Sequence, residues 1–384
     1  MDRYPSDQAL LPVGFDRFHR QAFINYQFNR AHALGYARAA DLRRAAAGIR
    51  SVSDCVPVFE TLSLEAVSDE RLQHAASYLR VAEFFTPQQT ADKLHRYRRF
   101  RNLFDRAFAE SGMKRYEIAY AGSALPAYRL PAIGQPSRGT VLLHGGFDSV
   151  IEEFFAIWQR IAAAGFDVVA YEGPGQGGAR ALGGLTFDHN WEHPVAAVLD
   201  HFELESAGLV GLSMGGYWAL RAAGHEPRID RVVAWPPVYD WLYRLPAGIR
   251  SGARVMLRQQ DFMRWSVRVR TRLIPTLRHV VNQALYLVDS DDPIDAVNWF
   301  LGMNATHLES WRVTQDVLLV CGEHDAFQPP VLTRAQERAL TNARSVTVRT
   351  FTEAEHADQH CQMGNLDLAC KVITDWLTAS HPRA

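Results

Sequence analysis

One short segment of the chain has the residue types and spacing of an activated serine. Residues 211–215 read Gly-Leu-Ser-Met-Gly, follow the apolar run 207–210 and precede a helical pattern that begins at Gly216. A serine on a sharp turn between a strand and a helix is exposed in strained backbone geometry, and flanking glycines leave the room that such a turn needs. The segment therefore predicts that Ser213 is a nucleophile, and the alternative is a plain turn serine.

A serine hydroxyl attacks a carbonyl only when a base takes its proton and a third group holds that base in place. Two acids, Glu323 and Asp325, lie on the loop after the apolar run 316–321. Functional groups in parallel sheets gather at the carboxyl ends of the strands, where this loop is expected to lie. Asp325 lies deeper in the loop and is the predicted orienting acid, with Glu323 as the competing candidate.

Two histidines compete for the role of the base. His356 and His360 both lie on the loop after the last predicted strand, and the residues alone do not separate them. Their spacing, with Asp358 and Cys361 nearby, also allows a metal site. Serine chemistry needs no metal, however, and the sequence shows no further ligand cluster. We therefore expect neither a metal nor a cofactor.

Attack by a serine creates an oxyanion that two backbone N–H groups must stabilise. Met214, directly after the serine, supplies the first donor. The second is expected from Gly146 or Phe147, in the segment His-Gly-Gly-Phe at the end of the third predicted strand. Glycine in that segment permits a close approach of the backbone.

A second glycine-rich segment, 173–178, formally matches the dinucleotide fingerprint G-x-G-x-x-G. Its context does not fit. Pro174 lacks the N–H that a phosphate requires, the following residues continue as loop, and no acidic residue ends a strand at the expected distance. Nicotinamide binding is therefore not the favoured interpretation.

The elements that must position these residues alternate between strand and helix from residue 114 onward. Short β-branched or aromatic runs are separated by glycine-rich turns and by helical patterns at 151–164, 216–223, 330–340 and 366–377. Such alternation predicts an α/β fold with a mostly parallel sheet that is covered on both faces. The predicted strands are 115–121, 126–131, 139–144, 167–172, 207–212, 230–235, 316–321 and 345–351.

Two further regions lack this alternation of strand and helix. Residues 1–113 show aromatic and aliphatic residues at helical spacing and predict an N-terminal helical region. Residues 238–313 are helical, rich in arginine, and interrupt two predicted core strands, so they are interpreted as a cap insertion. The core then comprises residues 114–237 and 314–384.

Composition excludes several classes of protein. The 384 residues are 47% hydrophobic and 22% charged, which is neither disordered nor fibrous, and 41 Lys plus Arg against 42 Asp plus Glu leave a net charge of −1. This balance gives no reason to expect a nucleic acid or a membrane as partner and favours a small-molecule substrate. The start of the chain shows no secretory leader, and no apolar run is long enough to span a membrane. Four sparse cysteines favour a reducing cytoplasm.

The predicted cap carries nine arginines between residues 244 and 278, opposed by Asp261 alone. Most are interpreted as a solvated helical face. The alternative is that some bind an anionic substrate or the acidic surface of a carrier protein that presents the substrate. The sequence does not determine the oligomeric state, and a homodimer stays open.

Across residues 114–380 the chain resembles the α/β-hydrolase superfamily. In that superfamily the serine comes first in the sequence, then the acid, then the histidine, and Ser213, Asp325 and a late histidine follow the same order. Three segments are closer to one subgroup: His-Gly-Gly-Phe from 144, Glu-Gly-Pro-Gly-Gln-Gly from 172, and His-Cys-Gln-Met-Gly-Asn from 360. That subgroup has an N-terminal helical region. It includes 2,6-dihydroxypseudooxynicotine hydrolase and fungal enzymes that shorten polyketide pigment precursors.

The resemblance implies a cofactor-free hydrolase that cleaves a carbon–carbon bond next to a ketone, with the N-terminal helices helping the cap to enclose the substrate. It assigns the role of base to His360 and suggests Asp240, early in the insertion, as an assisting acid. The subgroup often has Asp where this chain has Glu172, for which we expect a structural effect only.

The function expected from the sequence is that of a serine hydrolase acting on an acyl bond of a small organic metabolite, either a carbon–carbon bond next to a ketone or an ester or thioester. One alternative is acyl transfer or cyclisation in secondary metabolism through the same acyl-enzyme. Another is a catalytically silent binding protein, because a fold alone does not establish activity.

Overall fold

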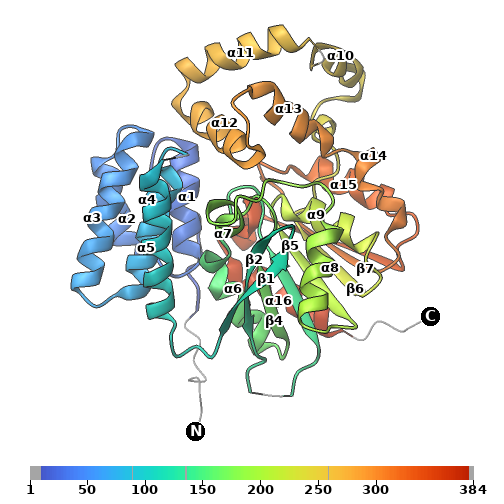
Figure 1. Cartoon of the computed structure of the whole chain (residues 1–384), viewed down its shortest axis with the longest axis horizontal. Coiled ribbons are helices and arrows are strands. Elements are labelled where there is room, and N and C mark those ends of the chain that lie inside the picture. The colour runs from blue at the N-terminus through green and yellow to red at the C-terminus, as the bar shows by residue number, and fades with distance from the viewer. Residues whose placement is uncertain (1–9, 89, 135, 258, 380–384) are drawn as a thin grey trace.

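An eight-stranded sheet lies at the centre of the computed structural model, which describes residues 10–88, 90–134, 136–257 and 259–379 (Figure 1). The strand order is β1-β2-β4-β3-β5-β6-β7-β8, and only β2 runs antiparallel to its neighbours. The predicted mostly parallel sheet is therefore confirmed. The strands are β1 (Lys114–Tyr120), β2 (Ser123–Leu130), β3 (Thr140–His144), β4 (Asp167–Tyr171), β5 (Ala207–Leu212), β6 (Ile229–Trp235), β7 (Asp316–Gly322) and β8 (Ser345–Phe351).

Helices cover both faces of this sheet. Successive side chains of a strand point to opposite faces, and in β3 Val141 and Leu143 join one buried cluster while Leu142 joins the other. Both faces are apolar, which explains why the inner strands read as continuous hydrophobic runs rather than as alternating ones. One face carries α6 (Phe155–Ala163) and α16 (Leu366–Thr378), and the other carries α8 (Glu192–His201), α9 (Gly215–Ala223) and α15 (Pro330–Ala339).

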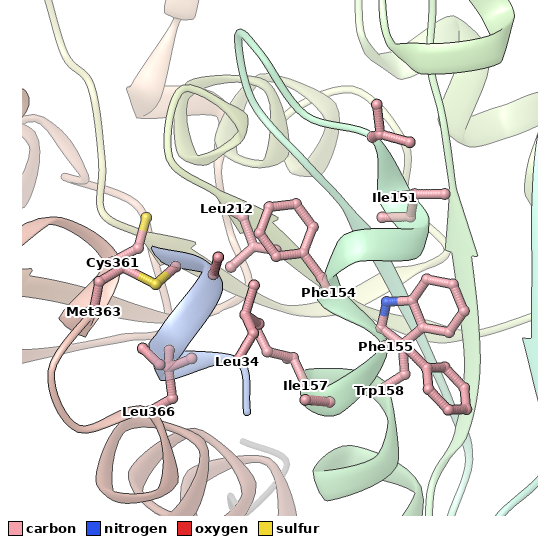
Figure 2. Close-up of a cluster of buried hydrophobic side chains, with 14 of the residues drawn as sticks. Leu34, Ile151, Phe154, Phe155, Ile157, Trp158, Leu212, Cys361, Met363 and Leu366 are labelled. Atoms are coloured by element: carbon pink, nitrogen blue, oxygen red, sulfur yellow. The ribbon is translucent and has the colours of Figure 1, made fainter. Parts of the chain in front are cut away.

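The N-terminal helical region packs directly against the face that carries α6 (Figure 1). Figure 2 shows Leu34 among Phe154, Ile157, Met363 and Leu366, which come from distant parts of the chain. The N-terminal helices and the sheet layer thus share one hydrophobic core. The helices are α1 (Ala22–Ala33), α2 (Ala39–Gly48), α3 (Cys55–Ser68), α4 (Leu72–Phe85) and α5 (Ala91–Ala107).

The insertion between β6 and β7 forms a helical layer over the carboxyl edge of the sheet (Figure 1). Arg258, one of its nine arginines, lies outside the described residues. In the part of the chain that the structure describes, no helix is both long and apolar enough to cross a bilayer. The elements of the insertion are η3 (Trp241–Arg244), α10 (Ala247–Leu257), α11 (Gln260–Leu273), α12 (Pro275–Val288), α13 (Pro293–Gly302), α14 (Ala305–Leu308) and η4 (Ser310–Arg312).

Because the core is shared, we expect Leu34→Ala to destabilise the whole chain. Leu34 is 3% exposed, and truncating a buried leucine costs about 2–5 kcal/mol through lost transfer energy and the cavity that remains. Urea unfolding followed by circular dichroism should show a lower midpoint for one common transition. Leu64→Ala, at an exposed leucine of α3, is the control and should leave the midpoint unchanged. An unaltered midpoint for Leu34→Ala would mean that the N-terminal region does not share the core.

Candidate active site

Ser213 lies on the tight turn between β5 and α9, with a left-handed φ of 57°. The turn is possible because its neighbours are glycines. A Cβ on Gly211 would lie 2.1 Å from the carbonyl oxygen of Gly215, and one on Gly216 would lie 2.2 Å from that of Pro236. This geometry pushes the hydroxyl of Ser213 out of the sheet edge, as the sequence motif predicts.

The structure brings the three predicted triad residues together. His360 Nε2 lies 2.9 Å from Ser213 Oγ, and His360 Nδ1 lies 2.7 Å from Asp325 Oδ2. The three side chains come from the end of β5, from the loop after β7 and from η6 (His360–Gln362), and all lie at the carboxyl edge of the sheet. The other carboxylate oxygen of Asp325 accepts the backbone N–H groups of Phe327 (2.8 Å) and Gln328 (2.7 Å), which fix its orientation.

The charges around His360 suit a general base. His360 is buried, and burial acts to lower the pKa of its imidazole. The buried carboxylate of Asp325 outweighs this effect and raises the pKa of His360 well above its ordinary value. Asp325 therefore favours the protonated form of the His360 ring.

The competing candidates lie elsewhere. His356 is exposed and follows η5 (Glu353–Glu355), so the structure brings His360 and not His356 to Ser213. Glu323 accepts the backbone N–H of Glu353 at 2.6 Å. Asp358, the acid of the alternative metal site, pairs with His324 at 3.0 Å. Among the described residues no group of three or more His, Cys, Asp or Glu side chains is placed to hold a metal ion.

One of the predicted oxyanion donors already has a hydrogen-bond partner within the protein. The N–H of Gly146 donates to Ser149 Oγ at 2.7 Å, and Phe147 lines the cavity in front of Ser213. The N–H of Gly146 is thus already paired, and the choice between Gly146 and Phe147 as the second donor stays a prediction. Gly146 also permits a close approach of the two loops, because a Cβ there would lie 2.8 Å from the Met214 backbone nitrogen.

The sequence did not single out Gln328, which is buried beside the triad. In the orientation that satisfies both neighbours, its side-chain amide donates to the carbonyl of Pro236 and accepts the N–H of Met214, each at 3.1 Å. The first oxyanion donor therefore has a partner within the protein, and an incoming carbonyl oxygen must share or replace it.

The glycine-rich segment 173–178 contacts the loop after β3, which carries Gly146 and Phe147. Gln176 is buried, and its amide nitrogen donates to the carbonyls of Gly145 (2.7 Å) and Gly146 (3.1 Å), while its amide oxygen accepts the N–H of Gly173 at 2.9 Å. The backbone N–H groups of Gly173, Gly175 and Gly178, which a phosphate would need, are all paired within the protein. The segment therefore supports the loop after β3.

A cavity of about 220 Å³ lies in front of Ser213. All three parts of the chain contribute to its wall, and most of the contributing side chains are aromatic or aliphatic. The N-terminal helices supply Phe23, Tyr26, Arg30 and Phe84, the insertion supplies Trp241, Arg244, His279, Val280 and Phe300, and the core supplies Phe147, Asp148, Leu212, Phe327 and Met363, among others.

Asp240 does not belong to this wall. Its carboxylate accepts the N–H of Leu242 at 2.8 Å and caps η3, and it borders a different cavity on the far side of Trp241. The suggestion that Asp240 assists the reaction is therefore corrected: the structure gives it a capping role. The position early in the insertion is close to the site in sequence, but the side chain points away from it.

An acid that the sequence did not identify, Asp148, lies in the cavity wall. Arg30 of α1 pairs with it at 3.0 Å, and Arg80 of α4 donates to its carbonyl at 2.6 Å. Burial alone would raise the pKa of Asp148, but these two guanidinium groups outweigh it and hold that pKa below its usual range. Both arginines also contact Glu153 at the start of the following helix. The N-terminal helices thereby fix the loop that carries Phe147.

Proteins of known structure share the fold over most of the chain, including the N-terminal helices. A 2,6-dihydroxy-pseudo-oxynicotine hydrolase superposes with a TM-score of 0.64 at 18% identity, over 91% of this chain and 94% of its own. The protein AbyA5 superposes with a TM-score of 0.66 at 21% identity, over 88% and 90%. At these identities the likeness shows the fold alone.

Curated relatives are fungal hydrolases. Hydrolase acrC of Aspergillus aculeatus is 30% identical over 227 residues, which are 50% of this chain and 53% of the relative. The 20-hydroxy-prefusarin hydrolase of Gibberella moniliformis is 33% identical over 184 residues, which are 42% and 43% of the two chains. The chain spans about half the length of the curated relatives it matches.

A sequence model described as the alpha/beta hydrolase family matches residues 140–364. This range contains the turn at Ser213, the loop of Asp325 and the histidine at 360, and it covers more than half of the chain. The predicted resemblance to this superfamily is confirmed, and the chain belongs to the alpha/beta hydrolase family.

Proposed function

We propose that this chain is a serine hydrolase that cleaves an acyl bond in a small, largely apolar ketone or ester. The observation that carries the proposal is the hydrogen-bonded series Ser213–His360–Asp325, with distances of 2.9 and 2.7 Å, at the floor of an apolar cavity. A base within hydrogen-bond reach of a strained serine, and itself held by a buried carboxylate, is the arrangement that acyl transfer needs.

In the first half of the reaction Ser213 Oγ attacks the carbonyl carbon and its proton passes to His360 Nε2. The oxyanion forms beside the N–H group of Met214 and that of Gly146 or Phe147, and Gln328 releases the N–H of Met214 as the negative charge develops. Preorganised N–H donors are typically worth on the order of 100-fold to 1000-fold in turnover each. The positive imidazolium is stabilised by Asp325.

The bond to the leaving group then breaks, and the leaving group takes the proton from His360. An alcohol or thiol leaves with this proton on oxygen or sulfur. In carbon–carbon cleavage the electron pair stays on carbon as an enolate, which the same proton converts to the ketone. Water next attacks the acyl-enzyme, gives its proton to His360, and the proton returns to Ser213 as the carboxylic acid leaves.

Other titratable groups of the cavity support His360 in this role. Asp148 is ionised because its pKa is held below the usual range, and burial lowers the pKa of His279 to about 4, so His279 is neutral at pH 7. Burial raises the pKa of Tyr26 well above its ordinary value, so its phenol keeps its proton. Tyr26 packs against His360 with ring centroids 5.9 Å apart, which orients the imidazole.

The cavity favours a substrate with an aromatic or extended apolar body. Phe84, Phe147, Trp241, Phe300 and Phe327 supply flat apolar surface around the reacting carbonyl. The similarity to a 20-hydroxy-prefusarin hydrolase and to the fold of a 2,6-dihydroxy-pseudo-oxynicotine hydrolase supports a metabolite of this kind. We therefore place the substrate among polyketide-like or heteroaromatic ketones and esters.

Replacing the nucleophile tests the proposal. Ser213→Ala is expected to abolish labelling by a fluorophosphonate probe and to lower hydrolysis of an aryl ester by about ten-thousand-fold or more, because the acyl-enzyme can no longer form. Labelling is read by mass spectrometry of the intact protein. Ser251→Ala, at an exposed serine of α10, is the matched control and should keep both properties. Parent protein that neither labels nor turns over ester would favour a silent binding protein.

Two substrates separate the possible leaving groups. Purified protein is offered an aryl ester and an aromatic β-diketone of similar size, and the products are followed by chromatography and mass spectrometry. Cleavage of both, each lost in Ser213→Ala, is expected if His360 can protonate a carbon leaving group. Turnover of the ester alone would reject carbon–carbon cleavage and leave an esterase.

The pH dependence follows from the raised pKa of His360. Only the neutral imidazole accepts a proton, so kcat/KM should be low in acid and rise as pH increases through this pKa. Asp325 raises the pKa of His360. The midpoint of the rise in kcat/KM should therefore lie above about pH 6.5, which is the pKa of a free histidine. Asp325→Asn removes the attraction between the carboxylate and the imidazolium, while burial still lowers the pKa of His360. The midpoint of kcat/KM against pH should therefore move to lower pH, and its plateau should fall. A midpoint that stays in place would mean that another group controls the acid limb.

A further inference from the structure

The cavity in front of Ser213 is lined mostly by apolar side chains, but one part of its wall is polar. Asp148, on the loop after β3, contributes to this part, together with His279 and Gln283, which lie one turn apart on α12. Asp148 and Gln283 also line a second cavity of about 220 Å³, so they lie at the boundary between the two cavities. The mechanism of acyl transfer uses none of these three side chains.

The carboxylate of Asp148 has one oxygen that the protein does not pair. Its Oδ1 accepts a hydrogen bond from Arg30 at 3.0 Å, whereas its Oδ2 has no hydrogen-bond partner among the described residues. The side chain is 26% accessible. Because Arg30 and Arg80 keep this carboxyl ionised, Oδ2 can only accept a hydrogen bond. A ligand in the cavity that carries a donor would therefore find an acceptor here.

Gln283 supplies the complementary donor. Its amide oxygen accepts a hydrogen bond from the side chain of Gln88, which lies between α4 and α5. Its amide nitrogen has no hydrogen-bond partner in the part of the chain that the structure describes. The bond to Gln88 fixes which end of the amide is used within the protein, and the two N–H donors at the other end stay available.

His279 adds further unpaired polarity to the same part of the wall. Its ring packs among Phe23, Phe84 and Phe85, with centroid distances of 5.7, 5.1 and 5.8 Å, and its Nε2 is buried without a hydrogen-bond partner. The carboxylate of Asp148 lies near enough to act on the pKa of this ring. An apolar side chain would fill the same place without an unpaired nitrogen, so the imidazole costs stability that a purely structural role does not explain.

We propose that Asp148 and Gln283, with His279 beside them, bind a hydroxyl group of the substrate. A hydroxyl both donates and accepts, so it can donate to Asp148 Oδ2 and accept from the Gln283 amide. A ketone oxygen only accepts and would leave the carboxylate unpaired, and a carboxylate would be repelled. An ammonium group gains less, because Arg30 already balances the charge of Asp148. The inference rests on the proposed function and narrows its substrate to a ketone or ester with a hydroxyl remote from the reacting carbonyl.

A hydroxyl bound at Asp148 would orient the substrate toward the triad. Asp148 follows Phe147 in the chain and lies near enough to His360 for the two charges to interact. The aromatic wall provides contact area for the substrate body, but apolar contacts alone do not determine which way it points. The hydroxyl contact sets this direction and so places the carbonyl at Ser213.

Esters that differ only in a hydroxyl test this site. The para-nitrophenyl ester of phenylacetic acid is compared with its ortho-, meta- and para-hydroxy derivatives, in which a methylene group separates the ring from the ester and keeps its reactivity nearly constant. At least one hydroxy ester is expected to exceed the unsubstituted ester by about 10-fold to 100-fold in kcat/KM, mainly through a lower KM. If the protein hydrolyses these esters and no hydroxy derivative is preferred, the proposal is rejected.

Variants assign the preference to these side chains. Asp148→Asn and Gln283→Leu should each lower the ratio of kcat/KM between the hydroxy ester and the unsubstituted ester by about tenfold. Val280→Ala removes an apolar side chain of α12 from the same wall and should change both esters alike, so that the ratio stays. Asp148→Asn leaves Arg30 unbalanced, so circular dichroism verifies its folding, and Gln283→Leu carries the test if it does not fold. A ratio that Gln283→Leu leaves unchanged would overturn the proposal.

Binding to Ser213→Ala separates this inference from the proposed function. Isothermal titration calorimetry compares phenylacetamide with its three hydroxy derivatives, which need not react. Tighter binding of a hydroxy derivative, lost when Gln283→Leu is added, supports the site even if the parent protein hydrolyses no ester. Equal binding of all four amides rejects the site whether or not esters are hydrolysed. Tighter binding of an aminomethyl derivative than of any hydroxy derivative would mean that Asp148 binds a cation, and would reject the hydroxyl assignment.

Discussion

The end of β6 holds Ser213 and His360 within hydrogen-bond distance of each other, and this contact is the centre of the candidate site. The carbonyl of Trp235 accepts the N–H of Ser213 at 2.6 Å and lies 3.5 Å from the thiol of Cys361, the residue after the histidine. The indole N–H of Trp235 donates to Gln362 at 2.5 Å. β6 lies between β5 and β7 in the sheet, so one strand end sets the distance between nucleophile and base. Ser213 and His360 are 147 positions apart in the sequence, and the end of β6 joins the two segments that carry them.

A second constraint acts from the opposite side of the cavity. Asp148, Arg30, Glu153, Arg80, Glu83 and Lys93 form a buried series of alternating charges that joins the loop after β3 to α1, α4 and α5. Three cations and three carboxylates balance, so the series carries no net charge. Removing one member of such a set leaves an uncompensated buried charge, which costs about 3–5 kcal/mol. The N-terminal helices thus fix the loop after β3 and also line the cavity in front of Ser213.

Local sequence patterns predicted the parts of the site that depend on local chemistry. The strands, the turn at Ser213 and the loop of Asp325 follow from apolar runs and glycines within a few residues of each position. The choice between His356 and His360 did not, because both lie on one loop and only its folding decides which ring reaches Ser213. The pairing of Arg30 with Asp148 spans 118 residues and leaves no spacing that could be read from the sequence. Asp240 was misjudged because a position near the site in sequence does not determine where a side chain points.

The insertion shows a different limit of sequence patterns. Helical periodicity predicts helices in this segment, but it does not indicate which arginines contact the protein. Most of the arginines were predicted to be solvated, and six of the described ones are exposed, whereas Arg250 and Arg264 are partly buried against Tyr243 and Asp292. A guanidinium can stack on a ring and bind a carboxylate together, so a polar face can dock on a polar underside. Such contacts depend on how the helices of the insertion pack, which periodicity along one helix does not determine.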